Sequence, residues 1–166
     1  ERRINLGVVN GRRFAFAAGV GADAQAVRLV DGAGRAKGRR PGDAYFAAQI
    51  MRTLLRGDFR EPQLEVWMEG KVVARGVSVF AANVHPWSYL GPFALKLAPR
   101  ATFEGGLDVV VPSDMRRRHL PRYATQLLVT GSQARRHDRL LAYLHDVEGV
   151  SVVCRRPLPL HADGDD

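Results

Sequence analysis

The sequence predicts an α+β domain in which a mostly antiparallel, β-sandwich-like arrangement of strands carries two or three helices. Two pairs of β-rich runs are joined by turn dipeptides, Asn10-Gly11 and Glu69-Gly70, and therefore indicate hairpins. Strands and helices do not alternate regularly, as they would in a parallel βαβ sheet. With 166 residues and 46% hydrophobic residues, the chain is long enough for one domain with its own core. We therefore expect residues 1–166 to form one domain.

The first half of the chain predicts a hairpin followed by helices. The run "INLGVVNGRRFAFAAG" reads as two strands turning at Asn10-Gly11, and "ADAQAVRLV" as a short helix at 22–30. Residues 31–42 are rich in glycine and arginine and lack periodicity, which is typical of a loop. Asp43 is a suitable N-cap for a helix that runs to 56 and ends at Gly57.

The second half predicts mainly strands and one further clear helix. A second hairpin covers 63–83, and an aromatic loop rich in proline and glycine follows at 84–101. The run "GLDVVVP" reads as a buried strand, and 116–131 as a helix with Pro121 in its first turn and Gly131 as its stop. We expect another short helix or a loop at 136–149, and then one or two closing strands in "VSVVCRRPLPLHADG".

The charge of the chain predicts binding to phosphate groups. Its formal net charge is +8, and basic residues cluster at 35–40 and 116–118. Such clusters attract nucleic acid, nucleotides or an anionic membrane, although a solvated surface explains any one cluster equally well. Cys154 is the only cysteine, so an internal disulfide is impossible and the cytoplasm is the expected compartment. Because the chain begins at Glu1 and ends abruptly, we expect it to be a piece of a longer protein.

Common catalytic motifs do not account for the sequence. Gly19, Gly21 and Ala24 match G-x-G-x-x-A, but no parallel strand ending in an acidic residue follows, so a tight strand-to-helix turn is favoured over a nicotinamide site. The chain contains neither a P-loop motif nor a G-x-S-x-G elbow. The five histidines also lack the spacing of zinc ligands: His85, His119, His137, His145 and His161.

The run Glu104-Gly-Gly-Leu-Asp108 is the most suggestive cluster of carboxylates. A carboxylate at the entry to a strand, beside flexible backbone with available carbonyl groups, can hold a hard cation such as Mg²⁺. Taken alone, the run also fits an ordinary turn with a solvated glutamate.

Four stretches in order resemble the bacterial diacylglycerol kinase and YegS-like lipid kinase family, which is related to sphingosine and ceramide kinases. "FAAGVGADAQAV" resembles the segment that opens the family's second domain, and "VSVFAAN" resembles its strand ending in asparagine, here Asn83. "LAPRATFEGGLDVVV" resembles its Pro-x-Ala-x-x-x-Asp-Gly-x-Leu-Asp-Val signature. The closing "RPLPLHADGDD" resembles the family's Asp-Gly-Glu, through Asp163 and Gly164.

The resemblance implies that the chain is the C-terminal, lipid-binding lobe of a two-lobe lipid kinase. In such a kinase, ATP and Mg²⁺ are the cofactors, and the other lobe carries a Gly-Gly-Asp-Gly-Thr nucleotide loop that this chain lacks. The implied partners are that N-terminal lobe and a lipid substrate at a membrane surface, which makes the protein cytoplasmic and peripheral to the membrane. A homo-oligomer stays open. The acceptor hydroxyl could belong to diacylglycerol, a sphingoid base, a prenyl or glycolipid alcohol, or phosphatidylglycerol.

Residue roles follow from the resemblance only where positions match. Asp165 occupies the place of the family's general base, where the family has glutamate, and Asp163 is the next candidate. Glu104 occupies the place of an aspartate that binds Mg²⁺, with main-chain oxygens from Ala101 and Gly106, the latter in place of the usual leucine. The candidates for substrate binding are Asn83, Trp87 and Tyr89. Because the lone closing turn lacks the other lobe, we expect it to be frayed.

Two other functions remain as alternatives to a kinase lobe. A basic nucleic-acid-binding domain would explain the charge, but the aromatic residues lie in a loop with only Lys96 nearby and no recognition helix stands out. A relative that has lost catalysis and still binds lipid would carry the same motifs.

Overall fold

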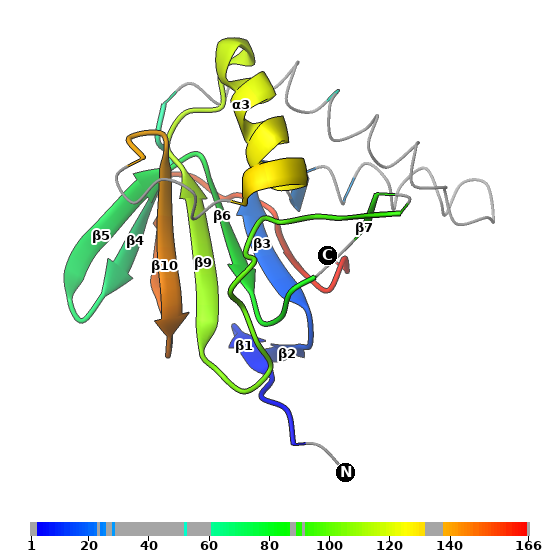
Figure 1. Cartoon of the computed structure of the whole chain (residues 1–166). Helices are drawn as coiled ribbons and strands as arrows, with labels where there is room; N and C mark the ends of the chain where they lie inside the picture. Colours follow the sequence, from blue (N-terminus) through cyan, green and yellow to red (C-terminus); the bar gives the residue numbers. More distant parts are fainter. Residues whose placement is uncertain are drawn as a thin grey trace.

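A computed structural model describes residues 3–22, 24–25, 28, 52, 61–86, 89–90, 92–131 and 138–165. Its largest element is a five-stranded sheet in the order β10-β9-β6-β3-β12, in which every neighbouring pair is antiparallel (Figure 1). Its strands are β3 (Ala17–Gly21), β6 (Ser78–Ala82), β9 (Leu107–Pro112), β10 (Leu141–Val147) and β12 (Leu160–Ala162).

Three smaller antiparallel units complete the described strands. A three-stranded sheet has the order β11-β4-β5, and two hairpins pair β1 with β2 and β7 with β8. Their bounds are β1 (Gly7–Val9), β2 (Arg12–Phe14), β4 (Leu64–Met68), β5 (Lys71–Gly76), β7 (Tyr89–Leu90), β8 (Phe93–Ala94) and β11 (Ser151–Cys154). The antiparallel, sandwich-like prediction is therefore confirmed.

The two predicted hairpin turns have the backbone geometry that their sequences require. Asn10 and Gly11 have φ values of 49° and 81°, and Glu69 and Gly70 have values of 51° and 74°. Two consecutive positive φ angles are typical of the type I′ turns that join twisted antiparallel strands. The turns connect β1 to β2 and β4 to β5, as the sequence indicates.

The described part of the chain contains one substantial helical segment, at 117–130. It consists of a 3-10 turn (Arg117–His119), α3 (Leu120–Thr125) and a π-helical turn (Gln126–Thr130). Pro121 stands in the first turn of α3, and the segment ends at Gly131 with φ 80°, so this helix prediction is confirmed. The helices predicted at 22–30 and 43–56 lie almost entirely outside the described residues.

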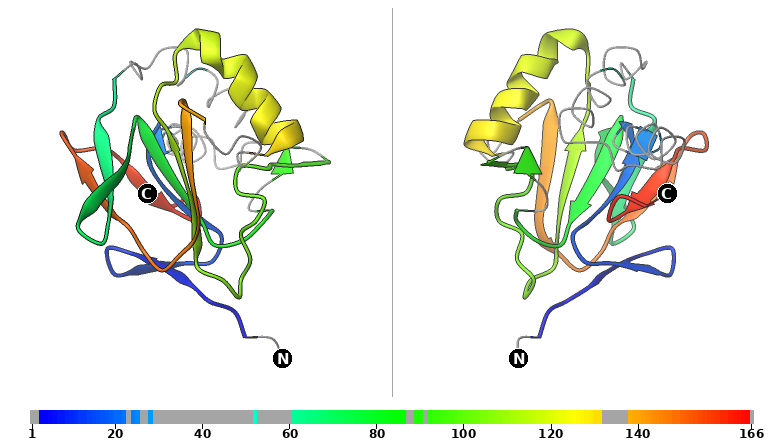
Figure 2. Two further views of the ribbon diagram at one scale, coloured as in Figure 1. Left: turned by 60° about the vertical axis from the view of Figure 1, so that its left-hand side comes forward. Right: turned by 90° about the vertical axis from the view of Figure 1, so that its right-hand side faces the viewer.

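The five-stranded sheet has an apolar layer on each face, and together these layers form the core. The helical segment and the three-stranded sheet lie on opposite sides of this central sheet (Figure 2). On one face, Phe80 and Val110 pack with Tyr123 of α3. On the other face, Val79 and Val109 pack against Leu64 and its neighbours in the three-stranded sheet. The central sheet therefore separates the helix from the second sheet.

The expectation of a short helix or loop at 136–149 was wrong, because 141–147 form strand β10. Both faces of this strand are covered: Leu141 and Tyr143 face the layer with the helix, whereas Ala142 and Leu144 face the second sheet. A strand covered on both faces lacks the alternation of polar and apolar residues that identifies a strand in a sequence.

The G-x-G-x-x-A segment is not part of a parallel nucleotide-binding unit. Strand β3, which contains Gly19 and Gly21, pairs antiparallel with both of its neighbours, β6 and β12. Gly21 has φ 95°, and a Cβ atom there would lie 2.7 Å from the carbonyl oxygen of Val77. Gly21 therefore permits a tight strand end, as the sequence favours.

Candidate functional site

The closing turn at 163–165 is tightly folded against the central sheet. Ala162 and Asp165 exchange two backbone hydrogen bonds, of 2.9 and 3.0 Å, across a turn in which Asp163 and Gly164 have φ values of 53° and 86°. The expectation that this turn is frayed was therefore wrong. Strand β12 pairs with β3 of the same chain, so the turn needs no second lobe to hold it.

Asp163 holds this turn in place through its carboxylate. The Oδ2 atom accepts a hydrogen bond from the backbone N–H of Ala15 at 2.6 Å, and Oδ1 accepts from Phe16 at 2.8 Å and Ala17 at 3.0 Å. Because Phe14 ends β2 and Ala17 begins β3, the carboxylate binds the break between these two strands. Both of its oxygens bind backbone N–H groups, which indicates a positioning role for Asp163.

Asp165 presents its carboxylate to solvent at the end of the same turn. Its side chain is 78% exposed and lies 3.3 Å from the Arg12 guanidinium, which is itself 46% exposed. The two carboxylates of the turn thus differ, since one is held by backbone donors and the other is accessible beside a cation.

Asn83 follows β6 directly and is buried, with 1% of its surface exposed. Its Nδ2 atom donates to the carbonyl oxygens of Asn5 at 2.8 Å and Ala15 at 3.0 Å. Its backbone N–H also donates to the carbonyl of Phe16 at 2.8 Å. Asn83 and Asp163 therefore hold the segment 15–16 from two sides, and this segment links the closing turn to the centre of the domain.

The three predicted Mg²⁺ ligands lie in one loop before β9. Ala101 is buried and its carbonyl accepts an N–H bond from His85 at 3.1 Å, whereas the Glu104 residue is exposed. The N–H of Gly106 donates a hydrogen bond to Asp146 Oδ1 at 2.7 Å, and this bond does not use the carbonyl oxygen of Gly106. A carboxylate and two carbonyl oxygens are donors that suit Mg²⁺, and the carbonyl of Ala101 keeps a second lone pair.

No group of three or more histidine, cysteine, aspartate or glutamate side chains that could hold a metal is present among the described residues. A cation in this loop would therefore depend on the single carboxylate of Glu104, together with main-chain oxygens and water. The residue set fits Mg²⁺ in donor type.

Sequence reasoning missed a polar network that supports this loop from β10. The buried carboxylate of Asp108 accepts hydrogen bonds from the Tyr143 hydroxyl, from His145 Nδ1 at 2.7 Å and from the backbone N–H of Asp146 at 3.0 Å. Burial, together with the adjacent Asp108 carboxylate, raises the pKa of Tyr143. The phenol therefore stays protonated and donates to Asp108.

Asp146 connects this network to the loop before β9. It has φ 56° at an irregularity between Leu144 and Val147 in the pairing of β10 with β9. This conformation lets its carboxylate accept the Gly106 N–H. A Cβ atom at Gly106 would lie 2.6 Å from the carbonyl oxygen of Val147, so a larger residue at this position would require the backbone to shift. No local sequence motif predicts this network, because its residues come together only when β10 pairs with β9.

Of the two aromatic candidates for substrate binding, the structure describes only Tyr89. Trp87 lies outside the described residues. Tyr89 lies on β7 and is 57% exposed, and it is absent from the lining of the cavity described next (Figure 1).

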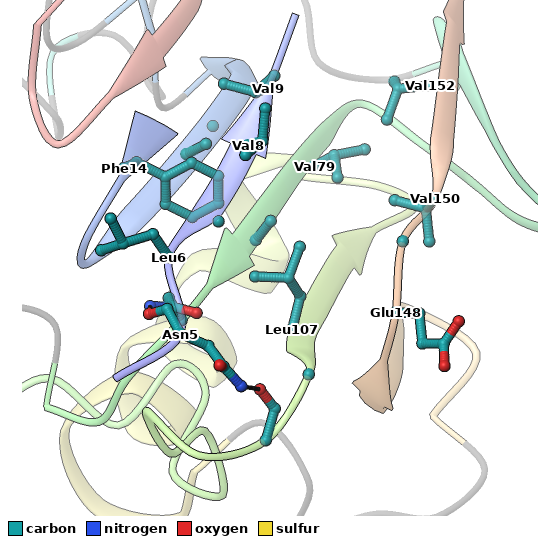
Figure 3. Close-up of a pocket in the computed structure, with 18 of the residues that line it drawn as sticks. Asn5, Leu6, Val8, Val9, Phe14, Val79, Leu107, Glu148, Val150 and Val152 are labelled. Carbon is teal, nitrogen blue, oxygen red and sulfur yellow. Dashed lines mark hydrogen bonds between the residues drawn. The ribbon is translucent and has the colours of Figure 1, made fainter. Parts of the chain in front are cut away.

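A cavity of about 750 Å³ lies between the β1–β2 hairpin and the segment that leads into β11 (Figure 3). Strands β6 and β9 contribute Val79 and Leu107 to its lining. Both Asn83 and Glu104 also line it, so the cavity meets the candidate site.

Comparison with solved structures identifies the fold. A diacylglycerol kinase from Bacillus anthracis str. Sterne matches 98% of this chain with a TM-score of 0.56 and 12% sequence identity. The chain has a diacylglycerol-kinase-like fold. A second structure, a putative diacylglycerol kinase from the same organism, matches 99% with a TM-score of 0.56 and 15% identity.

The match covers 46% and 47% of those two kinase chains, so this chain spans about half of their length. No protein-family model matches the sequence, and no curated protein matches it. Within the described residues, no helix is both long and apolar enough to cross a membrane.

Proposed function

We propose that this chain is the lipid-binding lobe of an ATP-dependent kinase that phosphorylates a hydroxyl group of diacylglycerol or a similar lipid. The observation that carries the proposal is the closing turn, where Asp163 is bound to three backbone N–H groups and Asp165 is left exposed. The fold shared with diacylglycerol kinases supports it. A second lobe would bind ATP, in agreement with the greater length of those kinases.

Asp165 is the proposed general base. Phosphoryl transfer needs an acceptor oxygen in line with the γ-phosphate, and a base that takes the hydroxyl proton as the new bond forms. A carboxylate that is open to solvent can approach a bound alcohol, whereas one whose oxygens bind backbone N–H groups cannot do so without breaking those bonds. The guanidinium of Arg12 lies 3.3 Å from this carboxylate, so a cation stands beside the proposed base.

Glu104, with the carbonyl groups of Ala101 and Gly106, is the proposed Mg²⁺ site. Bound there, Mg²⁺ would neutralise negative charge near the transferred phosphate. The role of this chain is to hold the loop in shape, through the bond from Gly106 to Asp146 and the network around Asp108.

Association with an anionic membrane surface completes the proposal. Arg116, Arg117 and Arg118 are exposed at the start of the helical segment. Arg116 pairs with Asp114 at 3.3 Å, and Arg118 Nε donates to His119 Nε2 at 3.0 Å. The three arginines together are the candidates for contact with lipid phosphates. The basic cluster at 35–40 lies outside the described residues.

The decisive experiment measures phosphorylation by the complete protein, with both lobes, from radiolabelled ATP and Mg²⁺ across a panel of lipid alcohols. We expect Asp165→Asn to reduce turnover about 10²–10⁴-fold, the usual contribution of general base catalysis. Apparent affinity for the lipid should change little, because asparagine keeps the size of the side chain.

Glu61→Gln provides a matched control, because it removes an exposed carboxylate before β4, away from the closing turn. It should leave turnover unchanged. Near-normal turnover of Asp165→Asn would remove Asp165 as the base, and inactivity of the unmodified protein toward every lipid alcohol would favour a relative that has lost catalysis. We also expect this chain alone to transfer no phosphate.

A further inference from the structure

His161 is a buried histidine beside the closing turn, and the proposed reaction does not use it. It lies on β12, two residues before Asp163, and 4% of its surface is exposed. Its cross-strand neighbour in β3 is Gly19, which in turn lies opposite Phe80 of β6. Directly opposed residues of antiparallel strands share one face of the sheet, so the imidazole lies on the face that carries Phe80. Because Gly19 has no side chain, β3 leaves room for the ring on this face.

The backbone N–H groups of the closing turn have two kinds of acceptor. Those of Ala162, Asp163 and Asp165 donate to backbone carbonyl groups at 2.8–3.0 Å. The N–H of Gly164 donates instead to a side chain, His161 Nδ1, at 3.4 Å. Because this bond is longer than the backbone bonds, it is weaker than they are, and it adjusts a turn that the other contacts already hold together.

The bond from Gly164 defines both the state of the imidazole and the orientation of one peptide plane. Nδ1 can accept from an N–H group only if it carries no hydrogen, so the neutral ring has its proton on Nε2. The donating N–H belongs to the peptide unit that joins Asp163 to Gly164. The direction in which the chain continues to Asp165 depends on this plane and on the φ of 86° at Gly164.

We propose that His161 is a positioning residue for Asp165. Its Nδ1 atom orients the turn so that the exposed carboxylate of Asp165 faces the acceptor hydroxyl, while Asp163 anchors the turn to the sheet. The inference rests on the proposed function, in which Asp165 is the base. It also gives a role to Gly19 of the G-x-G-x-x-A segment, which is to seat the imidazole in place of a nucleotide.

Two amide substitutions separate the position of the acceptor from its chemistry. In asparagine the carbonyl oxygen is bonded to Cγ, as Nδ1 is in histidine, whereas in glutamine it is one bond farther from the backbone. In the complete protein, His161→Gln should reduce kcat about tenfold, as expected from the loss of one hydrogen bond, and should change KM for the lipid alcohol little. His161→Asn should keep kcat within about threefold of the native value, because its oxygen can accept from Gly164.

Equal kcat values for the two variants, or an effect confined to KM, would overturn the positioning role. Thermal unfolding checks that both variants are folded. If His161→Gln is not, His161→Phe takes its place, because phenylalanine keeps an aromatic ring and has no acceptor; a folded His161→Phe variant with native kcat would likewise overturn the role.

A measurement without ATP keeps this inference separate from the proposed function. In the chain itself, exchange of the Gly164 amide hydrogen, followed by NMR, should be about tenfold faster in His161→Gln than in His161→Asn. Equal exchange rates would overturn the bond as the means of positioning. Exchange as expected, together with inactivity of the native complete protein toward every lipid alcohol, would overturn the proposed function and leave His161 with a purely structural bond.

Discussion

Substitution of the two aspartates of the closing turn should have opposite effects: loss of Asp163 should lower stability, whereas loss of Asp165 should lower activity. In the native protein, Oδ2 of Asp163 accepts a hydrogen bond from the N–H of Ala15 at 2.6 Å, and Oδ1 accepts from Phe16 and Ala17. In Asp163→Asn, the amide oxygen can still accept from Phe16 and Ala17. The NH₂ group must then face the N–H of Ala15, and two donors cannot form a hydrogen bond. Asparagine tolerates the positive φ of 53° at this position, so the backbone adds little cost. The change therefore tests the hydrogen bonds of the carboxylate.

The magnitude follows from the number and type of these bonds. A hydrogen bond to a charged group contributes about 1.5–3 kcal/mol, and exposure of Asp163 to solvent places this one toward the lower end. Loss of one bond and weakening of two should lower the free energy of unfolding by about 2 kcal/mol. For a chain of 166 residues, this corresponds to a fall in melting temperature of about 4–8 °C.

Thermal unfolding followed by circular dichroism measures this effect, and Asp165→Asn is the control. The ion pair between Asp165 and Arg12 is exposed, so its loss should cost no more than about 1 kcal/mol. Asp165→Asn should thus reduce turnover in the complete enzyme with little loss of stability. A melting temperature of Asp163→Asn within 1 °C of the native value would refute the role given to that carboxylate.

Three other predictions follow from the structure. Burial, with a smaller effect of Lys96, lowers the pKa of His85 below its usual 6.5, so the unfolded state binds more protons between the two values. The free energy of unfolding should therefore fall as pH decreases below about 6.5, and denaturant titrations from pH 7 to 5 should show a smaller fall for His85→Gln. Replacing Arg117 and Arg118 with serine should weaken binding to anionic vesicles about thirtyfold, because each arginine contributes about 1 kcal/mol. Co-sedimentation with vesicles measures this binding. Unchanged binding of the variant, or equal binding of the native chain to neutral vesicles, would contradict a charge-driven contact. Gly106→Ala should lower the melting temperature by several degrees in a thermal scan, because its Cβ would lie 2.6 Å from a backbone carbonyl; an unchanged value would show that β10 moves away without cost.

Much of the fold could be predicted from local sequence, because turns and helix ends depend on few neighbouring residues. Asn10-Gly11 and Glu69-Gly70 adopt the hairpin geometry that the sequence indicates, and Pro121 and Gly131 mark the first turn and the end of the helical segment. The kinase-like fold was also accessible, since four short motifs occur in a recognisable order. Strand β10 was not, because its residues are covered on both faces and show no alternation.

The candidate site divides in the same way. The sequence by itself singled out Asp163, Asp165 and Glu104, whose types and spacing resemble a known pattern. Only the tertiary structure showed that the carboxylate of Asp163 is held by backbone groups, since the three N–H groups that bind it come from residues nearly 150 positions earlier. The network around Asp108 and the cavity between the hairpin and β11 likewise arise where distant strands pair. Local sequence determines backbone conformation at turns and ends, whereas burial, hydrogen-bond partners and empty space depend on which distant segments the fold brings together.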